Sequence, residues 1–236
     1  MKKTIFIVGV SIIIIIALYF IISFMVNGTL WGKAKAENIA QEYLNKTYTQ
    51  KMIVNDTYYD IESNKYMATA YPKSNKAIKF FLFIDKQGNI WKDQYYLRYF
   101  GYELGKEANE YTKKLFGEDS RAYALIDGET IDIYNISTLN ENTKLKDVID
   151  KFDRKYYIGL VISGEFRNSV NETKKLYAII KYTNSLKYKP YKVCFSFYKE
   201  KSDTSNFHLS LKEKEYQSID CTGELLKYIN EEIKEQ

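Results

Sequence analysis

The sequence predicts an α+β protein with an N-terminal transmembrane helix and two small domains, each an antiparallel sheet packed by helices. Three observations lead to this prediction. An uncharged apolar run covers residues 4–26, segments of strand periodicity alternate with segments of helical periodicity after it, and we find no repeat of about 20 to 50 residues. Two prolines, 11 glycines and 45% hydrophobic residues exclude a collagen-like or disordered chain.

The apolar run follows Met1-Lys2-Lys3 and is 23 residues long. As a helix it would reach about 34 Å, more than the roughly 30 Å hydrocarbon core of a bilayer. The hydrophobic region of a cleaved signal peptide is only about 7–15 residues long, so the length favours a retained signal anchor. We therefore expect residues 4–26 to contact the lipid bilayer as one membrane span.

This anchor predicts the location of the rest of the chain. Residues 1–3 form a short cytoplasmic tail, because Lys2 and Lys3 favour the cytoplasmic side, and the C-terminal body lies outside the cytoplasm at the cell envelope. Lys2, Lys3 and Trp31 are the expected membrane-interface anchors. For Trp31, packing in the following domain is an equally good interpretation.

Residues 27–117 are predicted to form the first domain. A helix is expected from about Trp31 to Leu44, because apolar residues recur there at helical spacing. Three or four antiparallel strands should follow: residues 51–59, 66–71 and 77–84 are the candidates, and residues 90–93 begin a return strand. The loop between the last two contains Gly88, which can adopt the positive φ of a hairpin turn. A helix over residues 94–116 should close the domain.

Residues 118–236 are predicted to form the second domain, because the segment Gly117-Glu118-Asp119-Ser120 reads as a turn between two patterns. Strand patterns occupy residues 122–127, 130–136, 156–163, 191–197 and 207–211. Helical patterns occur around residues 145–152, 172–180 and 225–233. Ser169 and Glu172 have the spacing of a capping box at the start of the middle helix.

The sequence offers little catalytic chemistry. The single histidine, His208, alternates with Phe207 and Leu209, so it should face away from the core. The zinc-binding H-E-x-x-H, the phosphate-binding G-x-x-x-x-G-K-[ST] and the nucleophile elbow G-x-S-x-G are all missing. We therefore expect no catalytic residues, metal site or cofactor. An envelope hydrolase using carboxylates or a thiol is the alternative.

The two cysteines, Cys194 and Cys221, form a candidate disulfide. If the body lies outside the cytoplasm, oxidation is permitted. The bridge would stabilise the fold by about 3 kcal/mol on the chain-entropy model. Two free thiols are the alternative, because spacing along the chain does not give the Cα separation.

Residues 95–102 are the most unusual soluble segment, with aromatic residues around one of only four arginines. Tyr95, Arg98, Tyr99 and Tyr102 form a candidate interaction surface, since such residues are enriched at binding hot spots. Core packing is the alternative, because Tyr96 and Phe100 lie one helical turn apart. Gly101 and Gly105 would let this helix approach the sheet closely.

The net charge is +5, and the positive charge is almost all lysine. A nucleic-acid-binding protein is expected to carry a basic stripe with many arginines, so nucleic acid is not an expected partner. Residues 27–117 hold 14 Lys and Arg against 10 Asp and Glu. Electrostatic docking of this mildly basic domain on anionic lipid or wall polymer is a further alternative.

The chain resembles the uncharacterised YfjL-like membrane-anchored proteins of Gram-positive bacteria. The resemblance rests on the apolar N-terminus, the segments Ala36–Leu44 and Ile78–Leu82, and the strand Ile158–Ile162 with the helix at Leu176–Ile180. It implies an envelope location and two domains, and no catalytic residue. The first domain is also similar in layout to PepSY-type domains, some of which are thought to bind or restrain peptidases. We therefore expect a non-enzymatic module that binds an envelope protein or peptide.

Overall fold

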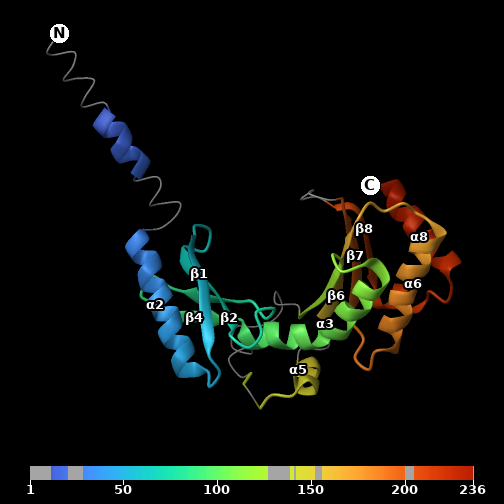
Figure 1. The fold of residues 1–236 in the computed structure, drawn as a ribbon, viewed down its shortest axis with the longest axis horizontal. Coiled ribbons are helices and arrows are strands. Elements are labelled where there is room, and N and C mark those ends of the chain that lie inside the picture. The colour runs from blue at the N-terminus through green and yellow to red at the C-terminus, as the bar shows by residue number, and fades with distance from the viewer. Residues whose placement is uncertain are drawn as a thin grey trace, which may run out of the picture. The chain divides into compact units, whose positions relative to one another are not determined.

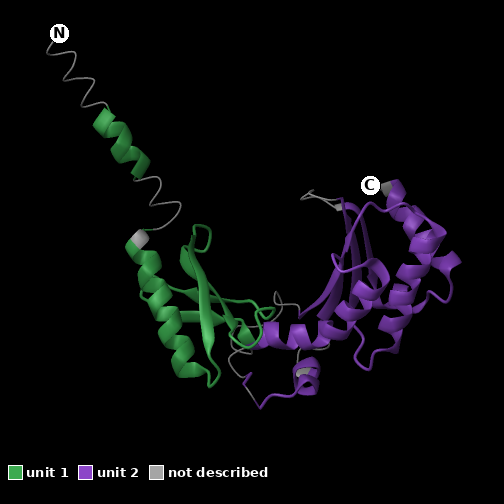
Figure 2. Ribbon diagram, viewed as in Figure 1, with its two compact units in different colours: residues 1–95 green, residues 96–236 purple. Residues whose placement is uncertain are grey.

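The computed structural model describes residues 12–20, 29–126, 139–140, 142–151, 156–199 and 205–235. The chain divides into two compact units, residues 1–95 and 96–236 (Figure 2). Each unit contains one four-stranded sheet with helices packed on it. The predicted α+β class is therefore confirmed for both halves of the chain.

The predicted transmembrane helix over residues 4–26 is wrong. Within the described ranges no helix is both long and apolar enough to cross a membrane. The described part of the run, residues 12–20, is helical. Ile13 and Tyr19 of this helix are each 67% exposed. The other residues of the run, like Lys2 and Lys3, lie outside the described residues.

In unit 1, helix α2 packs on an antiparallel sheet (Figure 1). Helix α2 (Leu30–Thr47) precedes strands β1 (Met52–Asp60), β2 (Lys65–Pro72), β3 (Phe80–Ile84) and β4 (Ile90–Asp93), which pair in chain order. The helix begins after Thr29, whose side chain accepts a hydrogen bond from the backbone N–H of Gly32 at 3.0 Å. Its predicted apolar stripe faces the sheet, with Ala36, Ala40 and Leu44 at most 2% exposed.

A β-bulge in β1 changes which side chains face α2. Val54 pairs with Ala70 and Asp56 with Thr69, so Asn55 is an extra residue without a register partner on β2. Because successive side chains alternate across a strand, one extra residue moves all later side chains to the opposite face. The bulge thereby brings Tyr59 to the same face as Met52 and next to its partner Tyr66.

Unit 2 is built on a mixed sheet with the strand order β5-β6-β7-β8. Its strands are β5 (Arg121–Ile126), β6 (Tyr156–Ser163), β7 (Lys192–Tyr198) and β8 (Ser205–Lys212). Strands β6 and β7 are parallel, so the prediction of a wholly antiparallel sheet is wrong here. Helix α6 (Val170–Ser185) joins them, because a parallel pair needs a crossover connection. The predicted strand at residues 130–136 lies outside the described residues.

The other helices of unit 2 are α3 (Tyr95–Phe116), α5 (Leu145–Lys151), α7 (Glu213–Gln217) and α8 (Thr222–Glu235). Helices α6 and α8 lie against each other on one side of the sheet (Figure 1). The predicted buried face of α6 is confirmed, with Leu176, Ile179 and Ile180 at most 2% exposed. Ser169 caps the helix by accepting from Glu172 N at 3.2 Å, while the Glu172 side chain accepts from Arg167 N at 2.8 Å.

Helix α3 belongs to unit 2 after its first residue, whereas the sequence predicted a boundary at Gly117. Gly101 and Gly105 of α3 lie directly on the backbone of Ala124 in β5, as their spacing indicated. Asn109 accepts a hydrogen bond from the backbone N–H of Ala122 at 2.9 Å. Gly117, with a φ of +102°, ends the helix.

Candidate functional site

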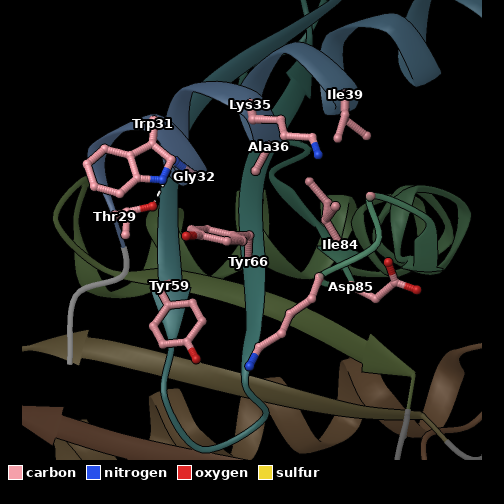
Figure 3. A pocket seen from close by; sticks show the side chains of 12 residues that line it. Thr29, Trp31, Gly32, Lys35, Ala36, Ile39, Tyr59, Tyr66, Ile84 and Asp85 are labelled. Carbon is pink, nitrogen blue, oxygen red and sulfur yellow. Dashed lines mark hydrogen bonds between the residues drawn. The ribbon is translucent and has the colours of Figure 1, made fainter. Parts of the chain in front are cut away.

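The candidate site is a pocket in unit 1 of about 300 Å³, shown in Figure 3. It lies between the first turns of α2, the ends of strands β1, β2 and β3, and the β3–β4 hairpin. Its lining residues are Thr29, Trp31, Gly32, Lys35, Ala36, Ile39, Tyr59, Tyr66, Ile84, Asp85, Lys86 and Gly88. All twelve belong to the same unit, so the site is complete within it.

The floor of the pocket is a row of side chains across three strands. In the sheet register Tyr66 pairs with Tyr59 on one side and with Ile84 on the other. Cross-strand partners project from the same face, so all three point toward α2. The rings of Tyr59 and Tyr66 lie 5.2 Å apart. The bulge at Asn55 is therefore what supplies one of the two aromatic rings.

The first turn of α2 forms one wall. Gly32 leaves room there, because a Cβ at this position would lie 2.0 Å from the Tyr66 hydroxyl oxygen and would displace that side chain. The missing side chain lets that hydroxyl reach the helix backbone. Trp31, next in the helix, is 68% exposed and projects at the rim of the pocket (Figure 3).

The β3–β4 hairpin forms the opposite wall, and its own hydrogen bonds hold it in place. The Asp85 carboxylate accepts from the Asn89 backbone N–H at 2.8 Å and from the Asn89 side-chain amide at 3.0 Å. The side-chain bond from Asn89 is the main reason that the Asp85 pKa is below its usual range. Gly88 has a φ of +93°, as the hairpin prediction required, and lies close to Ile39.

The charges around the pocket favour an anionic group. Lys35 and Lys86 are both exposed on its lining, and the first turn of α2 contains no acidic residue. The positive end of the helix dipole adds to their field. The one carboxylate of the lining, Asp85, is engaged by Asn89.

The four residues of the predicted interaction surface do not form one surface. Tyr95 is 4% exposed and packs edge-on against Tyr48 and Phe80 in the core of unit 1, at 4.8 and 5.2 Å between ring centroids. Tyr99 packs against Phe100 at 5.2 Å. The alternative of core packing is therefore the correct one for Tyr95.

The remaining members of that set lie in unit 2. Burial lowers the pKa of Arg98, and the neighbouring Tyr157 acts in the opposite direction. Tyr102 is only partly exposed. Arg98 is thus close enough to Tyr157 of β6 for the two groups to influence each other.

The candidate disulfide is not present, because Cys194 and Cys221 are both free. Cys194 lies on β7 with its sulfur 3.6 Å from the Ser210 hydroxyl oxygen, and Cys221 is exposed just before α8. The spacing of Cys194 and Cys221 along the chain allowed a disulfide, but the structure has two separate thiols.

His208 faces away from the core, as the alternation predicted, since its neighbours Phe207 and Leu209 are each 2% exposed. Its Nδ1 lies 2.8 Å from the Ser196 hydroxyl oxygen. Among the described residues, no group of three or more His, Cys, Asp or Glu side chains could hold a metal ion.

Sequence reasoning missed the pocket itself. The sequence allowed two interpretations of Trp31, a membrane-interface residue or a residue packed in the following domain. The structure places it at the rim of the pocket in unit 1. The available signal was local: Thr29 as a helix cap, Gly32 on the inner side of the first turn, and two tyrosines one hairpin apart. The bulge that aligns those tyrosines has no such signal.

No family model matches the chain, and no curated protein matches it. The solved structure of a DUF5037 family protein from Ruminococcus gnavus is similar over 84% of this chain and 80% of that one, with 14% identity and a TM-score of 0.42.

Proposed function

We propose that this protein is a binding module whose unit 1 pocket receives one apolar side chain of a peptide or protein partner. The observation that carries this proposal is Trp31, a large aromatic side chain held 68% exposed at the rim of a preformed pocket. Tryptophan is among the residues enriched at binding hot spots, the few positions that carry most of the binding energy of an interface.

The size of the pocket supports a side chain rather than a whole cofactor. At about 300 Å³ it lies at the small end of the range for ligand sites, which is roughly 300–1,000 Å³. Its lining is mainly aromatic and aliphatic: Tyr59, Tyr66 and Ile84 form the floor, and Ile39 of α2 also contributes. A phenylalanine or leucine side chain would bury its apolar surface there and gain about 1.5–3 kcal/mol.

The charges specify what should flank that side chain. Lys35 and Lys86 lie on the lining and are exposed, so acidic residues next to the inserted side chain can pair with them. Such rim pairs add modest affinity and weaken with salt. The preferred partner is therefore a segment with one large apolar residue between acidic residues.

The direct test is calorimetric titration of the full chain with the peptide acetyl-Glu-Glu-Phe-Glu-Glu-amide. We expect saturable binding that is lost when glycine replaces the phenylalanine and weakened when lysines replace the glutamates. Trp31→Ala should weaken binding at least tenfold, because it removes the rim of the pocket while leaving the core intact.

Trp91→Ala is the matched control. Trp91 is the other tryptophan of the chain, is 44% exposed, and does not line the pocket; its ring lies under the Lys65 ammonium at 3.4 Å. Its replacement should change affinity less than twofold. Equal losses in both variants, or equal binding of the glycine peptide, would contradict a pocket that selects an apolar side chain.

A further inference from the structure

The outward face of the sheet in unit 2 carries a second feature that the pocket does not explain. Helices α6 and α8 pack on the other face, where β7 and β8 place Phe195, Phe197 and Leu209, each at most 2% exposed. The alternate residues of the four strands therefore point outward. They are Arg121, Tyr123, Leu125, Tyr157, Gly159, Val161, Ser163, Lys192, Cys194, Ser196, Tyr198, Asn206, His208, Ser210 and Lys212.

Three tyrosines form a connected row on this face. Tyr157 packs edge-on against Tyr123 and against Tyr191, with 6.3 Å between ring centroids in each pair. The Tyr123 ring crosses Gly159 so closely that a Cβ there would lie 2.5 Å from it. The glycine thus makes room for an aromatic ring lying across the middle of the sheet, and that ring is 39% exposed.

The charge on this face has one sign. None of the outward strand residues of the described sheet is an aspartate or a glutamate, whereas Arg121, Lys192 and Lys212 are cationic. Lys192 lies directly opposite Lys212 in the register of β7 and β8, an arrangement that costs stability because like charges repel. Lys192 also lies 5.0 Å from the Tyr157 ring and 5.7 Å from the Tyr191 ring.

We propose that this face binds an anionic polysaccharide, a linear chain of sugars that carry carboxylate groups. The carboxylates would pair with Lys192 and Lys212 and relieve their mutual repulsion. Aromatic rings bind sugars by packing against the C–H faces of the sugar ring, and Tyr123 and Tyr157 supply such rings beside the lysines. The proposal is independent of the pocket, which lies in the other unit.

Short hydroxyl and imidazole groups favour a sugar over an acidic peptide as the occupant. Ser196 and His208 lie side by side at 2.8 Å, and Ser210 lies next to Cys194 at 3.6 Å. They are small donors and acceptors spread across a flat surface, suited to the many hydroxyl groups of a polysaccharide. Each sugar offers these groups several hydroxyls, whereas an acidic peptide offers only one backbone N–H and one C=O per residue besides its carboxylates.

The test is binding of the full chain to polygalacturonate at low salt, measured by calorimetry, with dextran as the neutral polysaccharide and poly-glutamate as the acidic peptide. We expect polygalacturonate to bind more tightly than poly-glutamate, dextran to bind at least tenfold more weakly, and added salt to weaken the binding of both anions. The double variant Lys192→Gln, Lys212→Gln should lower the affinity for polygalacturonate at least tenfold.

The matched control is the double variant Lys174→Gln, Lys181→Gln. Both residues are exposed on α6, which covers the opposite face of the sheet, and the charge change is the same. It should change affinity less than twofold, and neither double variant should lower the urea midpoint. If both double variants lose affinity equally, the overall net charge of the protein explains the binding and the proposal is overturned. If poly-glutamate binds more tightly than polygalacturonate, the face selects an acidic peptide and the proposal is also overturned.

Discussion

Replacing Gly105 by alanine tests the assignment of helix α3 to the second unit. A Cβ at this position would lie 2.6 Å from the backbone nitrogen of Ala124 and 3.1 Å from the carbonyl carbon of Tyr123. Both are main-chain atoms of β5, so no side-chain rotation can relieve the contact. The helix and the strand would have to separate along the seam that they share.

The magnitude follows from two opposing terms. Overpacking against backbone costs about 1–3 kcal/mol. Alanine improves helix propensity relative to glycine by roughly 0.5–1 kcal/mol. The difference spans roughly 0–2.5 kcal/mol, and we expect Gly105→Ala to lower the free energy of unfolding by about 1 kcal/mol, seen as a lower urea midpoint by far-ultraviolet circular dichroism.

Gly223 provides the matched control within the same unit. It is also helical, in α8, but a Cβ there would meet only the Cys221 sulfur at 3.7 Å, which is ordinary van der Waals contact. Gly223→Ala should leave stability unchanged or raise it slightly. If Gly105→Ala behaves the same way, α3 does not lie against β5.

Three further predictions concern single groups. Burial raises the pKa of Asp93 despite hydrogen bonds from Tyr48, Tyr95 N and Tyr43, so the folded state holds its proton more tightly than the unfolded state does. The stability that Asp93 contributes should therefore be greatest below about pH 3.8, fall as the pH rises through the raised pKa of the folded state, and stay constant above it. Urea titrations at several pH values should show this fall for the wild type and not for Asp93→Asn. Thr29→Ala should lower the urea midpoint of unit 1, followed by tryptophan fluorescence, by an amount corresponding to about 1 kcal/mol, because it removes the cap of α2; an unchanged midpoint would mean that the cap is dispensable. Because both thiols are free, Cys194 and the more exposed Cys221 should each be alkylated without reductant, Cys221 faster, and a mass unchanged by alkylation would contradict this.

The elements of the fold were largely predictable because their signals are local. The stripe of α2 and the cap at Ser169 each arise within a few residues, and both occur where the sequence placed them. The helix from Tyr95 was predicted too. Which unit it belongs to, however, depends on contacts that Gly105 and Asn109 make with β5, a strand further along the chain.

What the sequence did not reveal depends on register or on distant pairing. The bulge at Asn55 decides which face Tyr59 occupies, and nothing in the local pattern marks it. The parallel pairing of β6 and β7 depends on how α6 crosses the sheet. The apolar run at residues 4–26 predicted a membrane span from composition, yet no helix of the described residues is long and apolar enough to be one.

The most direct test of the proposed pocket is the fluorescence of Trp31 in the Trp91→Phe protein, which leaves Trp31 as the single tryptophan. Titration with acetyl-Glu-Glu-Phe-Glu-Glu-amide should shift its emission to shorter wavelength and saturate, because the inserted phenylalanine and the peptide cover a ring that is 68% exposed. The glycine peptide should leave the emission unchanged. An emission spectrum that stays the same with the phenylalanine peptide, or that shifts equally with both, would contradict a side-chain pocket beneath Trp31.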